Sequence, residues 1–502
     1  MVGISNRGDR RIPLALAVVV AAVFMTNLDL WIVNVALPSI GTGFGHAGRP
    51  SSLPALSWVL NAYAVGLAAL LIVAGRLGDR IGHRQVFLVG VCTFTVASAL
   101  CAIAPSLPVL VAARVLQAAG AAAQLPTSLA LLMAAVPAER RTVIARGWAA
   151  VGALAAASGP VLGGLLVGWS WRWIFLVNVP IGLASVLVGL RVLPRPPARQ
   201  REPLPDLLGA ALVTVAVAAL TGALVQASSW GWRSPAILAL LGLTGLAGAG
   251  FVRRCATHRH PLFELSLLRI RGFGLANAAT FTFSVGFSIM LLSNVLWCQQ
   301  LWHYSPLRTG LAMLPGPALV PVVTVLSSRA VHRFGSGPLA AAGSACFALA
   351  MLWRVAVVSV QPNYLLDLLP SMVLGGIGVG LALGTLIAAG VTALPAHRSA
   401  TGSAMVNVGR QVAAAVGVAV LVSLLGNRLA AADLTGFRTA WTVAAALSGL
   451  AGLLAAWLPK PVPAESVPAH PTEPIPANLA EHSTFAVVAV ARPVPGIGSE
   501  AP

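Results

Sequence analysis

The most constraining feature of the sequence is a series of apolar stretches, each about 20 residues long and nearly free of charge. At a rise of about 1.5 Å per residue, a helix of that length crosses a hydrocarbon core of about 30 Å. In a chain of 502 residues that is 58% hydrophobic and 9% charged, these stretches predict an all-α integral membrane protein. We expect about fourteen spans. They cover residues 14–37, 55–74, 86–104, 108–134, 147–167, 173–193, 206–226, 235–252, 273–297, 311–328, 338–357, 366–390, 401–424 and 439–458.

The basic residues follow the loops between these stretches. A net charge of +19 can indicate nucleic-acid binding, but the arginines are spread over short loops rather than gathered on a soluble domain. If the N-terminus is cytoplasmic, the inner loops carry about twenty Arg or Lys and the outer loops about six, which is the positive-inside pattern. We therefore expect a multi-pass protein of the inner (plasma) membrane, with both termini cytoplasmic and no nucleic-acid partner.

The spans group into two related halves. VPAERR (136–141) resembles LPAHRS (394–399), and AGRLGDRIGHR (74–84) has a decayed counterpart in SSRAVHRFGSG (327–337) at nearly the same offset. Such repeats are typical of membrane proteins built from two related bundles. The predicted organisation is an N-terminal bundle at 1–193, a linker with two inserted helices at 194–260, a C-terminal bundle at 261–458 and a disordered cytoplasmic tail at 459–502.

One carboxylate lies deep in an apolar stretch. Asp29 is part of MTNLDLWIVNVALPSI (25–40), whereas nearly all other acidic residues lie in loops, at helix ends or in the tail. An ionised carboxylate at such depth costs several kcal/mol unless it is paired, faces water or takes up a proton. Arg114, in the fourth stretch, is expected at a similar depth, about 10 to 14 Å from the outer helix ends. Burial favours the neutral carboxyl group and a nearby cation favours its charged form, so such a group can change its protonation state.

Further polar residues are expected around this pair. Gln117 follows Arg114 by three positions and therefore shares its helix face. The additional candidates for a polar cavity lining are Asn34, Asn61, Tyr63 and Gln124. The competing interpretation is a structural ion pair that fixes helix packing and has no other role.

Two glycine-containing motifs indicate tight turns and close helix packing. GRLGDRIGHR (75–84) places Asp79 among arginines just before the third helix, where a carboxylate can interact with helix N-terminal amides. SGPVLGGLL (158–166) has Gly159 and Gly163 in GxxxG spacing, and Pro160 removes a backbone donor. Generic positive-inside loops and simple helix packing are the alternative explanations.

The sequence lacks the residues that several other classes of protein require. A phosphate-binding P-loop requires a lysine after its glycines, and the only lysine is Lys460 in the tail. No soluble segment is large enough for an enzyme, and the polar rings of a gated channel are missing. Five cysteines without a CxxC pair and nine histidines without i, i+4 spacing predict neither a metal site nor another cofactor.

Together these motifs resemble the major facilitator superfamily, and within it the fourteen-helix drug:proton antiporter family, over residues 10–458. The family's motif between helices 2 and 3 is matched by Gly75, Leu77, Asp79, Arg80, Gly82 and Arg84. Its helix 4 motif is matched by Leu110, Arg114, Gln117 and Gly120, with Ala118 in place of a glycine. Its antiporter motif is matched by Gly159, Pro160, Gly163 and Gly164, with Ala155 where a glycine is usual.

Two further segments carry the resemblance. The helix 1 motif LDxTIVNVALP is present as LDLWIVNVALP, where Trp31 replaces a threonine next to the membrane-embedded carboxylate. GSAMVNVGRQVAAAVGVA (402–419) is similar to the family's helix 13, where Arg410 is a second embedded cation. A bulky Trp31 is expected to alter substrate selection.

The resemblance implies a major facilitator fold, with two six-helix bundles plus two inserted helices, and no enzyme activity. It makes Asp29 the proton site, Arg114 its modulator and the loop around Asp79 a conformational latch. The implied function is proton-driven export of lipophilic drugs or antibiotics by antiport with alternating access. Because no acidic residue lies deep in helices 9 to 14, we expect neutral, monocationic or anionic amphiphiles as substrates.

Two alternatives stay open at this point. One is a narrow-specificity exporter or permease for an endogenous metabolite or antibiotic, and the other, outside transport, is a membrane receptor or scaffold. The expected partners are the lipid bilayer, a small lipophilic substrate and protons. The proton gradient would be the energy source in place of any cofactor, and we expect a monomer.

Overall fold

The structure is a computed structural model, and it describes residues 6–45, 50–136, 141–194, 205–259, 261–395, 398–426 and 434–459. Within these ranges the secondary structure is helical, without a β-strand. Fourteen helical segments of the described chain are long and apolar enough to cross a membrane. The predicted all-α membrane fold and its number of spans are therefore confirmed. The predicted tail beyond Pro459 and most of the predicted linker, 195–204, lie outside the described residues.

The helices fall into three groups along the chain. The N-terminal group comprises α1 (Asn6–Gly43), α2 (Leu53–Ile81), α3 (His83–Ile103), α4 (Leu107–Ala134), α5 (Arg141–Val167), α6 (Trp173–Leu176) and α7 (Asn178–Val192). The middle group comprises α8 (Leu207–Trp230) and α9 (Pro235–Thr257). The C-terminal group comprises α10 (Leu265–Leu268), α11 (Arg271–Leu296), the π-helical turn η2 (Trp297–Leu301), α12 (Pro306–Met313), α13 (Pro315–Phe334), α14 (Ser336–Val357), the π-helical turn η3 (Tyr364–Leu368), α15 (Leu369–Thr392), α16 (Ser399–Leu425) and α17 (Leu434–Ala456).

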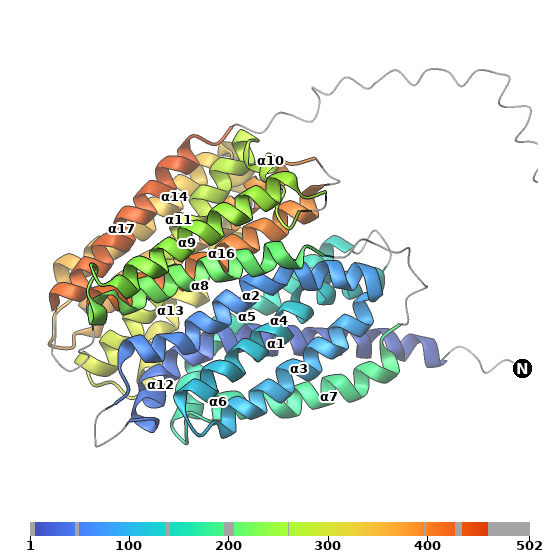
Figure 1. Ribbon diagram of the computed structural model, residues 1–502, viewed down its shortest axis with the longest axis horizontal. Helices are drawn as coiled ribbons and strands as arrows, with labels where there is room; N and C mark the ends of the chain where they lie inside the picture. The colour runs from blue at the N-terminus through green and yellow to red at the C-terminus, as the bar shows by residue number, and fades with distance from the viewer. Residues whose placement is uncertain are drawn as a thin grey trace, which may run out of the picture. The chain divides into compact units, whose positions relative to one another are not determined.

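The N-terminal and C-terminal groups use the same packing scheme. In the first, α1 packs against α5 and α7, while α3 packs against α4 and α7. In the second, α11 packs against α16 and α17, while α14 packs against α15 and α17. Figure 1 shows the two groups as separate bundles, coloured blue to light green and yellow-green to red. This correspondence is the structural form of the internal repeat in the sequence.

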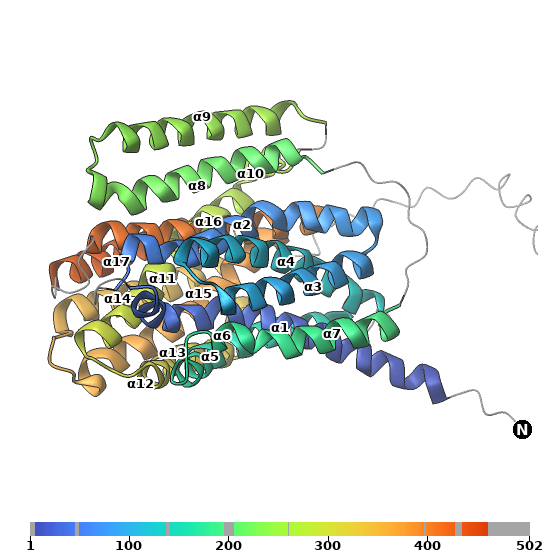
Figure 2. The ribbon, with the colours of Figure 1, turned by 60° about the horizontal axis from the view of Figure 1, so that its bottom comes forward.

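The helices α8 and α9 form a hairpin outside the two bundles. The α8 helix contacts both α2 of the N-terminal bundle and α16 of the C-terminal bundle. Figure 2 shows α8 on this face with α9 stacked beyond it. Only 11% of the residues in the most apolar part of α9 are buried, so most of the surface of α9 is available for contact with lipid. The exact domain limits at 193/194 and 260/261 stay predictions.

Local sequence accounts for several helix ends. Ser52 caps α2 by accepting a hydrogen bond from the backbone N–H of Ala55, and a proline in the first turn lacks the donor that would be unsatisfied there. The same serine and proline pattern starts α9 at Ser234 and α12 at Ser305. Between α2 and α3, Gly82 has a φ of 105°, which a residue with a side chain rarely adopts. A single glycine therefore reverses the chain there.

Candidate functional site

The candidate site begins with an ion pair between α1 and α4. Arg114 Nη1 lies 2.5 Å from Asp29 Oδ2. Both side chains are buried, with exposed fractions of 0% for Asp29 and 1% for Arg114. The two residues therefore meet inside the N-terminal bundle, as their expected depths indicated.

Neutral side chains complete the environment of the carboxylate. Asp29 Oδ1 accepts hydrogen bonds from Gln117 Nε2 at 2.9 Å and from Asn178 Nδ2 at 3.3 Å. The same two amide groups donate to Ser98 Oγ at 2.9 and 3.5 Å. Because these residues belong to α4, α7 and α3, the cluster connects four helices of one bundle around a single charge.

Arg114 is also fixed by contacts with neutral groups. Its Nη1 donates to Gln117 Oε1 at 2.6 Å, and its Nε donates to the carbonyl of Val59 at 3.1 Å. The guanidinium carbon lies 4.2 Å from the centroid of the Tyr63 ring, a favourable cation–π position. A buried pair is tolerated when its hydrogen bonds are satisfied in this way, and removal of one charge leaves the other uncompensated. Protonation of Asp29 would thus remove the counterion of Arg114.

A cavity between the two bundles borders this cluster. It has an empty volume of about 940 Å³, part of it open to solvent. Arg114 contributes to its wall, whereas Asp29, the ion-pair partner of Arg114, does not. Of the residues predicted to line a substrate cavity, those on this wall are Asn34, Asn61, Tyr63 and Arg410.

Several polar atoms on this wall have no hydrogen-bond partner among the described residues. They are Asn61 Oδ1, Tyr63 Oη and Ser284 Oγ. A buried polar atom without a partner costs free energy, about 1–3 kcal/mol in mutational series. Each of the three atoms is itself buried, so a molecule in the cavity can pair with it only if the side chain turns toward the cavity.

A second cavity, with an empty volume of about 820 Å³, adjoins the first. The two share Trp31, Phe287, Leu291, Leu383 and Arg410 in their walls. The rings of Trp31 and Phe287 meet edge to face, with centroids 6.0 Å apart, and form a partition between the cavities. The wall of the second cavity is mainly apolar, and its methionines are Met290, Met313, Met351 and Met372.

The two glutamines predicted for the cavity wall lie elsewhere. Gln117 is fully buried within the ion-pair cluster. Gln124 is also fully buried, donates to the carbonyls of Gly90 and Gly120, and accepts a hydrogen bond from Thr26. The expectation that these glutamines line the cavity is not met, because α4 turns this face toward α1 and α3 rather than toward the C-terminal bundle.

The predicted latch segment makes contacts within and between the bundles. Arg84 donates to the carbonyls of Leu190 and Leu193 at 2.7 and 3.0 Å, so it caps the C-terminal end of α7. Arg76 donates to the carbonyl of Pro261, which precedes α10, at 2.8 Å. The segment thus connects the N-terminal bundle to the chain that enters the C-terminal bundle.

The other latch residues lie around the same turn. Asp79 Oδ1 is 3.4 Å from His83 Nε2, and the Asp79 side chain is 55% exposed. Gly75 faces Pro126 of α4, and a Cβ at this glycine would lie 3.6 Å from the proline Cβ. The Arg80 side chain is half-buried. Their role in switching stays a prediction.

The glycine motif of α5 packs against α1 on one side. A Cβ at Gly159 would lie 2.5 Å from Trp31 Cβ, and one at Gly163 would lie 3.0 Å from the carbonyl oxygen of Ile32. Both distances are shorter than ordinary van der Waals contacts. The close packing predicted from the GxxxG spacing is therefore confirmed, and the partner helix is the one that carries Asp29.

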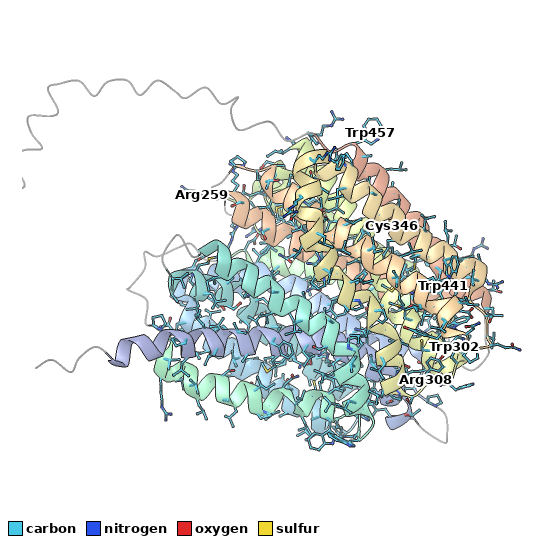
Figure 3. All side chains as sticks on the ribbon, turned by 180° about the vertical axis from the view of Figure 1, so that it is seen from behind. Arg259, Trp302, Arg308, Cys346, Trp441 and Trp457 are labelled. Carbon is cyan, nitrogen blue, oxygen red and sulfur yellow. The ribbon has the colours of Figure 1, made fainter. Side chains whose placement is uncertain are left out.

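On its other side the motif meets the C-terminal bundle. A Cβ at Gly164 would lie 2.6 Å from Leu307 Cα in α12 and would also overlap the carbonyl of Pro306. In the opposite direction, Gly310 of α12 faces the carbonyl of Pro160. Figure 3 labels Trp302 and Arg308 at this end, where the two bundles meet. A pair of glycines thus allows backbone-to-backbone contact between the bundles.

A second buried arginine was not identified from the sequence. Arg354 of α14 is 1% exposed, donates to Asn294 Oδ1, and donates to Ser371 Oγ at 2.9 Å. The described residues contain no carboxylate within ion-pair distance of it. The helices α11, α14 and α15 correspond to α1, α3 and α4 in the other bundle, so Asn294 stands on the counterpart of the helix that carries Asp29. The signal was an arginine inside an apolar stretch, ALAMLWRVAV, close to its end.

Two repeated bundles around a shared cavity, with an ion pair embedded beside it, define a secondary membrane transporter. The chain belongs to the Major Facilitator Superfamily, whose family model matches residues 19–418. The resemblance identified from the helix motifs is thereby confirmed, and the protein is a multi-pass membrane transporter rather than an enzyme.

Individual relatives and structures agree with this assignment. The chain is 36% identical to the Multidrug resistance protein Stp of Mycobacterium tuberculosis (strain CDC 1551 / Oshkosh), over 81% of this chain and 75% of that protein. It is 33% identical to the Tetracenomycin C resistance and export protein of Streptomyces glaucescens, over 83% and 76%. Its fold matches the crystal structure of an auto-inhibited POT family peptide transporter with a TM-score of 0.65 at 18% identity, over 90% of this chain and 98% of that one. The last likeness concerns the fold alone.

Proposed function

We propose that the protein is a drug-efflux transporter that exchanges inward-moving protons for outward-moving lipophilic compounds by alternating access. The observation that carries this proposal is the buried pair of Asp29 and Arg114 beside a cavity that both bundles line. Embedded ionisable groups in transporters mark ion pathways, because their charge is too costly to keep without a function. The names of the relatives, a multidrug resistance protein and a resistance and export protein, support efflux.

In this proposal, protonation of Asp29 is the coupling step. The neutral carboxyl group no longer compensates Arg114, which still has Gln117 and the carbonyl of Val59 as acceptors. The guanidinium is then more strongly attracted to polar groups on the cavity wall. This change in the N-terminal bundle biases its packing against the C-terminal bundle, and release of the proton reverses the bias.

The contact between α5 and α12 supports an inward-facing conformation in this proposal. If the N-terminus is cytoplasmic, the Gly164 end of α5 lies toward the outside. The bundles are then closed on the outside, and the described conformer corresponds to an inward-facing state. The plasma-membrane location, the cytoplasmic termini and a working monomer are parts of this proposal, as is the proton gradient as the only energy source.

The test uses inverted membrane vesicles with an imposed proton gradient. Gradient dissipation is recorded after addition of fluorescent dyes, quaternary ammonium compounds, neutral antibiotics and aromatic acids. We expect dissipation with wild type and none with Asp29→Asn. The matched control is Asp206→Asn, which changes a buried carboxylate that caps α8 and pairs with Arg254, away from the cavity. Full substrate-dependent dissipation by Asp29→Asn would remove this residue from the mechanism, and a response to a single compound would favour narrow specificity.

A further inference from the structure

The charged groups on the cavity wall are all cationic. Two arginines, Arg114 and Arg410, line the first cavity, and no Asp or Glu among the described residues does so. Asp29 is fully buried behind Arg114 and does not contribute to the wall. A molecule in the cavity therefore meets positive charge without direct access to the neighbouring carboxylate.

The two arginines differ in whether a counterion neutralises their charge. Arg114 has Asp29 as its counterion and further acceptors in Gln117 and Val59. Arg410 of α16 has neither an ion-pair partner nor a hydrogen bond to any described residue. Its polar neighbours on the same helix and the same wall are Asn407 and Gln411, both uncharged. Arg410 is the cation whose charge is left for a ligand.

An uncompensated cation in a membrane-embedded cavity attracts anions strongly, because the surroundings screen its charge poorly. Guanidinium groups match carboxylates and related oxygen anions in geometry and form strong charge-assisted hydrogen bonds with them. A cationic ligand at this position would face like charge, which is unfavourable in the same environment. The wall thus discriminates by charge sign.

The second cavity supplies the complementary apolar part of the site. Arg410 borders both cavities, so a ligand held there can extend past the ring of Trp31. Four methionines contribute to the wall of this cavity, and their flexible, polarisable thioethers adapt to aromatic ligands of different shape.

We propose that the preferred substrates are aromatic amphiphiles with one acidic group, a carboxylate or an acidic phenolate. The anionic oxygen pairs with Arg410, and the ring system occupies the methionine-lined cavity. This inference rests on the proposed transport function and names its substrate class. Because the acid pairs with Arg410 rather than with Arg114, the buried pair stays available for its proton.

The test measures binding to purified wild-type protein in detergent, where no proton gradient is needed. The probes share one ring system and differ in charge: 1-pyrenebutyrate, its methyl ester, and the corresponding trimethylammonium compound. We expect the acid to bind about 10- to 100-fold more tightly than the ester, as an added charged hydrogen bond implies, and the cation to bind more weakly than both. Equal affinity of wild type for the three probes, or preference for the cation, overturns the proposal without the need for any variant.

Variants of Arg410 test whether this residue causes the preference for the acidic probe. Arg410→Gln should reduce acid binding to the level of the ester while ester binding stays unchanged, and Arg410→Glu should favour the ammonium probe. Arg253→Gln, which alters an exposed arginine on α9, is the matched control and should keep the wild-type order. Loss of affinity for all three probes alike in Arg410→Gln contradicts the charge pairing. Charge-selective binding without gradient-driven transport would refute the proposed function alone, whereas transport of the three probes at equal rates with equal affinities would refute the substrate class alone.

Discussion

The close crossing of α5 and α12 predicts that one added methyl group shifts the balance between transport conformations. The Cβ of Gly164→Ala would lie 2.6 Å from Leu307 Cα, and the atoms that it meets belong to the backbone, so no side-chain rotation relieves the overlap. An ordinary carbon–carbon contact is about 3.5–4.0 Å, so the helices must separate by about 1 Å. Overpacking of this kind costs about 1–3 kcal/mol. Only the conformer that contains the contact carries this cost, so its population relative to the other should fall by about 5- to 150-fold.

Distances between spin labels at positions 170 and 305 measure this change. Both positions lie at the α5–α12 end of the bundles, and the five native cysteines are replaced by alanine beforehand. We expect Gly164→Ala to increase the fraction of long distances. The control is Gly147→Ala in the same helix, where a Cβ meets nothing within 4 Å. An unchanged distance distribution in Gly164→Ala, or an equal shift in both variants, refutes the argument that this crossing holds the bundles together.

Two further predictions concern the site. Arg114→Gln leaves the charge of Asp29 buried without a counterion, so it should lower the free energy of unfolding by about 3–5 kcal/mol. The additional change Asp29→Asn should restore most of this loss. Thermal unfolding in detergent measures both effects, and losses that simply add in the double variant would contradict direct pairing. Trp31→Ala removes the partition between the two cavities, so vesicles with this variant should transport large compounds faster relative to small ones. The control is Trp169→Ala, which alters an indole that is 71% exposed. Unchanged selectivity in Trp31→Ala would show that the Trp31 ring does not set substrate size.

The sequence predicted the number of spans and the meeting of Asp29 with Arg114, because both follow from length and depth. It did not reliably predict which side of each helix faces a partner helix. Lipid-facing and protein-facing sides of a membrane helix are both apolar, so hydrophobic periodicity does not reveal which side faces a partner helix. For this reason the sequence alone predicts Gln124 at the cavity, although its side chain bonds to α1 and α3.

Contacts between bundles were equally difficult to predict. Gly164 was recognised in its motif, but the reciprocal position of Gly310 depends on how two distant helices cross. The sequence does not single out Arg354, because it lies near the end of its apolar stretch, where an arginine can reach the membrane surface. Asn178 and Ser98 carry no charge, and nothing in their sequence context distinguishes them from ordinary polar residues inside a helix. Their place around Asp29 emerges only when four helices are brought together.

The hairpin of α8 and α9 makes the two seams between the bundles unequal. Along the seam of α2 and α16, α8 packs over both helices and keeps acyl chains away from the junction. Along the seam of α5 with α12 and α13, the inserted hairpin makes no comparable contact, and the helix that contacts both sides there, α1, belongs to the N-terminal bundle itself. A hydrophobic compound dissolved in the bilayer therefore has one sideways route toward the cavity instead of two. The two faces of the transporter would then differ in lipid contact, so the thickness and fluidity of the surrounding leaflet would affect substrate entry through a single flank.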